Sequence, residues 1–181
     1  MLIGVAFEVE NKYSNYLKRI FASIDMSAYY WEIVSDQILY EENGKTEQGL
    51  FNACINEEVE KSSQFEPNID KHTKESVYNK GVFIDGKSFA NAIERDSYYF
   101  IFSDLKAYSN KKKWGNIETY EDFIDSYCEM IFLCVDSMFI EIYCKDERIL
   151  QIIYDNCKKN NFNSIKYLVD SEAKQKSLIA F

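Results

Sequence analysis

The octapeptide at residues 81–88, GVFIDGKS, has the spacing G-x-x-x-x-G-K-S of a phosphate-binding loop. In such a loop the backbone N–H groups surround the phosphates, while Lys87 would contact the outer phosphates and Ser88 the metal ion. The apolar run 131–135 followed by Asp136 also fits the pattern of the carboxylate that holds magnesium. The nucleotide-binding candidates are therefore Gly81, Gly86, Lys87 and Ser88.

The segments around this match argue against nucleotide hydrolysis. A buried strand should precede such a loop, whereas residues 73–80, TKESVYNK, are polar. The interior of the loop should be small and flexible, whereas Val82, Phe83 and Ile84 are bulky and favour a strand. Nucleotide binding at 81–88 is thus a minor alternative, and no cofactor is predicted.

No other arrangement of nucleophiles, bases or metal ligands stands out. His72 is the only histidine and lies in a polar stretch, so no catalytic triad is indicated. The five cysteines show no CxxC spacing, and most of them lie in apolar patterns typical of reduced core residues. Neighbouring carboxylates are more typical of solvated charges than of catalytic pairs; they are Glu57, Glu58 and Glu60, or Asp96 and Asp104. We predict no catalytic residue and no metal site, and we favour a binding role over an enzymatic one.

The balance of charge restricts the partners. The net charge is −9 and the pI is about 4.8, whereas nucleic-acid and anionic lipid surfaces are bound by accumulated Lys and Arg. No apolar run reaches the roughly 18 residues of a transmembrane helix. The N-terminal MLIGVAFEVE lacks the basic region and cleavage site of a signal peptide. We expect a cytoplasmic protein without a nucleic-acid or membrane partner, and with an acidic surface suited to a basic protein.

Aromatic residues offer the best candidates for a binding surface. They make up 16% of the chain, with 14 tyrosines, and they cluster at 29–31, at 98–100 and around Trp114. Neighbouring residues of a strand point to opposite faces, so each strand cluster places one ring outside the main core, where Tyr and Trp can anchor a partner. The favoured function is a protein-binding module with an acidic, tyrosine-rich surface; its candidate residues are Tyr30, Tyr99 and Trp114. The competing interpretation is that these rings form a second core layer.

A second class of function is an enzyme or small-molecule binder. It would use a pocket beneath the polar segment 41–80, with Asp104, Tyr99 or Trp114 as candidate residues. A deep cleft with convergent polar groups would favour this alternative.

The elements that must position these residues are clearest at 130–169. An apolar run at 130–135, the turn formers Asp136 and Ser137, and alternation at 138–144 predict a β-hairpin. Asp146 is a good N-cap for a helix that continues to about residue 159, and alternation at 165–169 predicts a further strand.

The first third of the chain repeats this order. Residues 2–9 alternate as a strand, Asn11 can cap a helix reaching about Ile24, and strands are predicted at 29–34 and 37–40 with a turn near Ser35 and Asp36. Farther along, 98–105 is predicted as a strand, Thr119 and Asp122 resemble a capping box, and the apolar end 178–181 should dock on its own domain or on a neighbour.

Together these elements predict one α+β domain over residues 1–181. Two strand–helix–strand units would share a mixed, largely antiparallel sheet with helices packed on one face, in a ferredoxin-like or related arrangement. The segment 41–80, which carries the only proline, would be a polar insertion or long loop.

The stretches GVAFEVENKYSNYL, IDMSAYYW and FIEIYCKDE carry a resemblance. They are similar to a family of small bacterial cytosolic proteins, a domain of unknown function. The similarity extends over most of the chain and is strongest towards its two ends. It implies a single intracellular domain and transfers no catalytic residue.

Overall fold

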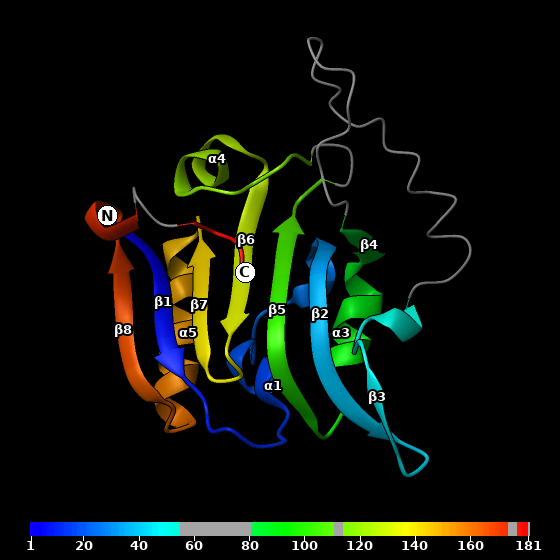
Figure 1. The fold of residues 1–181 in the computed structure, drawn as a ribbon. Coiled ribbons are helices and arrows are strands. Elements are labelled where there is room, and N and C mark those ends of the chain that lie inside the picture. The colour runs from blue at the N-terminus through cyan, green and yellow to red at the C-terminus, as the bar shows by residue number, and fades with distance from the viewer. Residues whose placement is uncertain (55–80, 111–113, 174–176, 181) are drawn as a thin grey trace.

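A computed structural model describes residues 1–54, 81–110, 114–173 and 177–180. The described strands form one eight-stranded sheet in the order β3-β2-β5-β6-β7-β1-β8, with β4 also paired to β2, and every pair is antiparallel. The predicted α+β class with a large antiparallel sheet is therefore confirmed (Figure 1). The strands are β1 (Leu2–Glu8), β2 (Tyr30–Glu42), β3 (Lys45–Gln48), β4 (Val82–Asp85), β5 (Tyr98–Tyr108), β6 (Cys128–Val135), β7 (Phe139–Cys144) and β8 (Asn163–Val169).

The C-terminal unit folds as its sequence predicts. β6 and β7 are joined by a tight turn in which Asp136 and Ser137 have φ angles of 51° and 65°, the left-handed values that a two-residue hairpin needs. The carboxylate of Asp146 accepts the N–H of Arg148 at 2.8 Å and caps α5 (Glu147–Lys159). β8 follows, but it does not pair with β7, because β1 lies between them. In the first unit, β1 and β2 are separated by three strands, and the ferredoxin-like detail stays a prediction.

The predicted turn at Ser35 and Asp36 is wrong. β2 is continuous over 13 residues, and its register against β5 shifts between Ile33 and Ser35 and again between Gln37 and Ile38. Such bulges change which face the side chains point to without reversing the chain. The break in alternation that suggested a turn therefore marks an irregular strand.

The first helix is also shorter than predicted. α1 covers only Tyr16–Ile20, because Ser14 exchanges two backbone hydrogen bonds with Tyr98 and keeps the preceding chain extended. After the helix, Ser23 adopts a φ of 68°, which helical residues do not adopt. The short helix η1 (Met26–Ala28) then leads into β2.

The prediction of a polar insertion at 41–80 is wrong for its first part. Glu41 and Glu42 end β2, and Asn43 with Gly44, at φ angles of 52° and 74°, turns the chain into β3. After β3, the short helix η2 (Asn52–Cys54) follows the buried residues Leu50 and Phe51. The rest of the insertion, residues 55–80, lies outside the described residues, together with His72 and the glutamates at 57, 58 and 60.

One face of the sheet carries α1, α5 and α3 (Gly86–Ile93) over the larger core (Figure 1). Aromatic rings stack in its centre, where Phe89 lies between Trp31 and Phe51 with centroid distances of 3.7 Å and 4.9 Å. These three side chains are fully buried. Most of the buried apolar side chains therefore lie in the core on this side of the sheet.

The other face is covered by a helix as well, which corrects the prediction that helices lie on one face only. α4 (Tyr120–Asp125) buries Tyr120 and Phe123 in a second, smaller core, and α6 (Asp170–Ala173) follows β8. The capping box predicted for α4 is confirmed, since Asp122 N–H donates to Thr119 Oγ1 at 3.2 Å and Thr119 N–H donates to Asp122 Oδ2 at 2.9 Å. The apolar C-terminal segment docks on its own domain beside this helix, with Leu178 and Ala180 buried.

Candidate functional site

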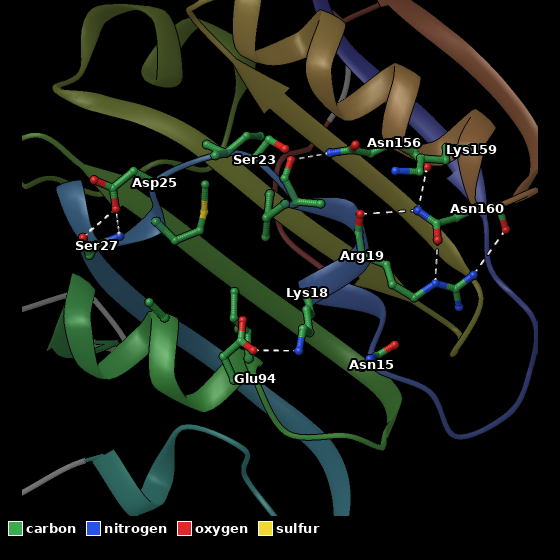
Figure 2. Close-up of a pocket in the computed structure, with 16 residues that line it drawn as sticks. Asn15, Lys18, Arg19, Ser23, Asp25, Ser27, Glu94, Asn156, Lys159 and Asn160 are labelled. Atoms are coloured by element: carbon green, nitrogen blue, oxygen red, sulfur yellow. Dashed lines mark hydrogen bonds and ion pairs between the residues drawn. The ribbon is translucent and has the colours of Figure 1, made fainter.

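The helical face holds a hollow of about 550 Å³ where α1, α3 and α5 end (Figure 2). All three helices contribute residues from their last turns, so the hollow is surrounded by helix C-termini. We call it the helix-end hollow. Its polar and charged lining residues include Lys18, Arg19, Asp25, Glu94, Asn156, Lys159 and Asn160.

Two asparagines of α5 satisfy the carbonyl groups that α1 leaves open at its end. The side-chain amide of Asn156 donates to the carbonyl oxygens of Ile20 at 3.0 Å and Ala22 at 2.7 Å. The amide of Asn160 donates to Arg19 O at 3.5 Å and to Asn156 O at 2.8 Å. The last carbonyl groups of a helix need hydrogen-bond donors, and by donating to them these amides join α1 to α5 across one wall of the hollow.

Arg19 is held in place by neutral groups. Its Nε donates to Asn160 Oδ1 at 2.8 Å, its Nη2 to the carbonyl oxygen of Asn160 at 3.3 Å, and its Nη1 to Ser14 Oγ at 3.1 Å. The guanidinium carbon lies 5.0 Å from the centre of the Phe162 ring. The positive charge of Arg19 therefore has no carboxylate beside it among the described residues.

An ion pair closes the opposite side of the hollow. Lys18 Nζ of α1 lies 2.7 Å from Glu94 Oε2 at the end of α3, and this hydrogen bond raises the pKa of Lys18. Glu94 also lines a second hollow of about 580 Å³, which we call the acidic hollow. Its other lining residues are Tyr13, Glu41, Arg95, Asp96 and Ser97.

The acidic hollow lies near the end of the sheet where β2 turns into β3 and β5 begins. Tyr13 lines it, and the ring of Tyr99 packs against that of Tyr13 with centroids 5.5 Å apart. Arg95 already has partners: its guanidinium carbon lies 4.3 Å from the centre of the Tyr40 ring, and its Nη2 lies 3.4 Å from Glu42 Oε1. The exposed carboxylates that remain, those of Glu41 and Asp96, have no ion-pair partner within the described part of the chain.

The structure does not bring the three predicted partner-binding aromatics together. Tyr99 lies beside Tyr13, whereas Tyr30 is opposite Tyr108 at the other end of the β2–β5 pair. Trp114 is half-buried, with its ring 5.5 Å from that of Phe83. Neither Lys18 nor Tyr13 was singled out from the sequence.

An enzymatic residue beside Tyr99 and Trp114 would have to reach the surface, but Asp104 is buried. It is 2% exposed and points into a buried group of charges, where Lys106 Nζ lies 3.4 Å from Asp104 Oδ1. Glu32, the cross-strand neighbour of Lys106, accepts the hydroxyl of Tyr108 at 2.9 Å. Burial raises the pKa of Asp104 to about 6 and also raises that of Glu32, although Lys106 opposes both shifts.

The residues of the G-x-x-x-x-G-K-S match form a strand and a helix with no loop between them. Val82–Asp85 is β4, and α3 begins at once with Gly86. The Asp85 carboxylate accepts the Ser88 N–H at 2.9 Å and the Ser88 hydroxyl at 2.8 Å and so caps the N-terminus of α3. The N–H and hydroxyl groups that would bind phosphate and metal are therefore already used in this cap. A Cβ on Gly86 would lie 2.3 Å from Tyr29 O, which shows that glycine serves close packing here. Gly81 precedes the strand and Lys87 is exposed.

No group of three or more His, Cys, Asp or Glu side chains among the described residues could hold a metal ion. None of the helices within them has the length and apolar character to cross a membrane.

The sequence of this chain is similar to those of other known proteins. Residues 2–80 and 58–179 match a family model described as "Protein of unknown function (DUF2691)". The chain is 27% identical over 175 residues to a Bacillus subtilis (strain 168) protein described as "Uncharacterized protein YncE", and the alignment covers 97% of each. No solved structure matches.

Proposed function

Since the chain belongs to the DUF2691 family, whose description states no activity, we propose from the geometry that it is a protein-binding module. Its partner presents a basic side chain to the acidic hollow, between the tyrosines Tyr13 and Tyr99 and the carboxylates of Glu41 and Asp96. The five cysteines are all free, which supports a cytoplasmic location, because disulfides persist mainly in oxidising compartments.

One observation carries this proposal: an exposed tyrosine and two carboxylates, which form no ion pair with any residue that the structure describes, line one hollow. Tyr13 is 41% exposed although its ring packs against Tyr99, and Glu41 and Asp96 are exposed as well. A lysine or arginine of a partner can place its charge between the carboxylates and its stem on the ring. A cation over an exposed aromatic ring contributes about 0.5–1 kcal/mol, and carboxylate pairing adds to it.

The edges of the sheet support side-chain recognition over strand addition. β3 is short and its four residues, KTEQ, are all exposed and polar or charged. On the other edge, β8 carries Lys166 and a left-handed residue, Ser164, at a φ of 53°. Charged side chains and irregular backbone are the features by which natural sheets prevent another strand from pairing.

The test is affinity capture with the full chain, followed by binding measurements with the captured protein in pure form. The informative variant is Glu41→Gln with Asp96→Asn, and its matched control is Glu121→Gln with Asp125→Asn, which removes the same charge from α4 on the other face. We expect the first pair to weaken binding about tenfold, because each exposed charge contributes up to about 1 kcal/mol. The control should bind like the wild type, and added salt should weaken the binding of the control and of the wild type alike.

Tyr13→Ala gives an independent check on the same surface. It removes the ring without changing the charge, so it should weaken binding without altering the salt dependence. Wild-type affinity in both Tyr13→Ala and the Glu41/Asp96 variant would show that the partner binds elsewhere.

A further inference from the structure

We propose that the helix-end hollow binds a small organic anion with an apolar body, such as a carboxylate on a short hydrocarbon chain. The anionic group lies near Arg19 and Lys159, and the apolar part contacts the hydrophobic lining (Figure 2). This site differs from the acidic hollow in the sign of its free charge.

The first observation is an excess of positive charge in one place on an acidic protein. Arg19 donates hydrogen bonds to three neutral oxygen atoms, and neither Arg19 nor Lys159 has an ion-pair partner among the residues that the structure describes. Both line the same hollow, although the chain as a whole has a net charge of −9.

The second observation concerns the two acidic residues of the lining, Asp25 and Glu94. Asp25 accepts the Ser27 N–H at 3.0 Å and the Ser27 hydroxyl at 2.5 Å. Glu94 is paired with Lys18 at 2.7 Å. Lys18 therefore neutralises Glu94, whereas Asp25 bonds to neutral donors and keeps its negative charge. The lining retains one net positive charge, because Arg19 and Lys159 outnumber Asp25.

The helix C-termini offer a competing explanation for these cations. Positive side chains in a last turn interact favourably with the helix dipole, by about 0.3–1 kcal/mol each. That effect applies equally to Lys158 and Lys159 of α5, yet only Lys159 lines the hollow, whereas Lys158 Nζ lies 4.5 Å from the Tyr154 ring. The open carbonyl groups of α1 are also satisfied by Asn156 and Asn160, so they do not require the ammonium group.

The size and the remaining lining define the ligand class. A volume of about 550 Å³ lies within the range of roughly 300–1,000 Å³ that small-molecule sites occupy. Apolar side chains also line it, among them Phe21, Ile24, Met26 and Ile93. A ligand that matches both parts has one charged end and one hydrocarbon end.

The experiment follows the backbone amide NMR signals of the isotope-labelled full chain during titration with hexanoate and, separately, with its uncharged analogue hexanol. We expect hexanoate to give saturable shifts at the ends of α1, α3 and α5, and hexanol to give weaker ones. Lys159→Gln should weaken hexanoate binding at least about threefold, the effect of losing one exposed ion pair. Lys158→Gln, which removes the same charge from the same helix turn, should leave it unchanged.

Three results would each overturn the proposal. They are equal shifts with hexanol and hexanoate, equal weakening by Lys158→Gln and Lys159→Gln, and the absence of saturable shifts at these helix ends. Both lysines are exposed, so both variants should fold, and the unperturbed amide spectrum of each shows whether they do. Protein-partner binding plays no part in this readout, so its outcome is separate from that of the proposed function.

Discussion

Lys18 of α1 and Glu94 at the end of α3 form an ion pair, with Nζ 2.7 Å from Oε2, and Glu94 lines both hollows of the helical side. Lys18 lines only the helix-end hollow. While the pair is formed, Glu94 weakens the attraction of Lys18 for an anion, and Lys18 weakens the attraction of Glu94 for a basic partner. The two proposed sites therefore share one pair of charges.

Glu94→Gln should separate these two effects. It removes the partner of Lys18, so it should strengthen hexanoate binding, and it removes a carboxylate of the acidic hollow, so it should weaken binding of a basic partner. The free energy of unfolding should change little, because the pair is largely exposed and screened by solvent. Titration of each ligand measures the two affinities; Glu121→Gln on α4 is the control and should change neither. A change of the same sign for both ligands would contradict the shared role of Glu94.

Stability should decrease as the pH rises through the range from about 4 to about 6. Burial raises the pKa values of Asp104 and Asp36 to about 6 in the folded protein, whereas unfolded aspartate titrates near 3.9. Between these values the folded state holds more protons than the unfolded state, so the free energy of unfolding falls with increasing pH. Urea unfolding at a series of pH values measures this slope.

Asp104→Asn should reduce that slope, since it removes one of the buried carboxyl groups whose pKa is raised. The largest possible difference is about 3 kcal/mol over the whole range, from two pKa units at about 1.4 kcal/mol each. Asp36 and Glu32 should keep the remaining slope. The exposed Asp125→Asn serves as the control and should follow the wild type; an unchanged slope in Asp104→Asn would show that Asp104 is ionised throughout.

Phe89→Ala should destabilise the fold by about 3–5 kcal/mol, the cost of emptying a large buried site. Its ring is fully buried between Trp31 and Phe51, so no neighbouring ring can fill the space without moving. Phe139→Ala makes the same chemical change at a residue that is 46% exposed and should cost much less. Both values come from urea unfolding curves, and similar losses in the two variants would argue against the stacked core.

Leu178→Ala tests whether the C-terminal segment is an integral part of the second core. Leu178 is fully buried and its N–H donates to Glu118 O at 2.7 Å, whereas the adjacent Ile179 is 40% exposed. We expect a loss of about 2–4 kcal/mol for Leu178→Ala and a small change for Ile179→Ala, because only the first opens a cavity. Thermal unfolding of both variants, with amide hydrogen exchange at residue 178, measures the difference. Rapid exchange there in the wild type would indicate that the segment is not docked.

Several elements followed from local signals alone. Residues within a few positions of one another specify each of them: the hairpin at Asp136 and Ser137, the N-cap Asp146, and the capping box of Thr119 and Asp122. The Asn43-Gly44 turn carried an equally strong hairpin signal, and it was missed because the surrounding residues are polar. In β2, the bulges disturbed the alternation on which strand prediction depends.

The candidate sites, in contrast, depend on contacts between distant parts of the chain. Arg19 and Asn160 are 141 positions apart, and Tyr99 and Asn11, whose side chains also share a hydrogen bond, are 88 apart. Backbone propensity and capping act over one or two turns, so local sequence determined the hairpin and the helix caps, while the composition of the chain determined its acidic character. Only the packing of α1, α3 and α5 on one antiparallel sheet decided that Lys18, Glu94 and Lys159 surround a common hollow, because burial of the apolar faces of these helices sets where their polar ends meet.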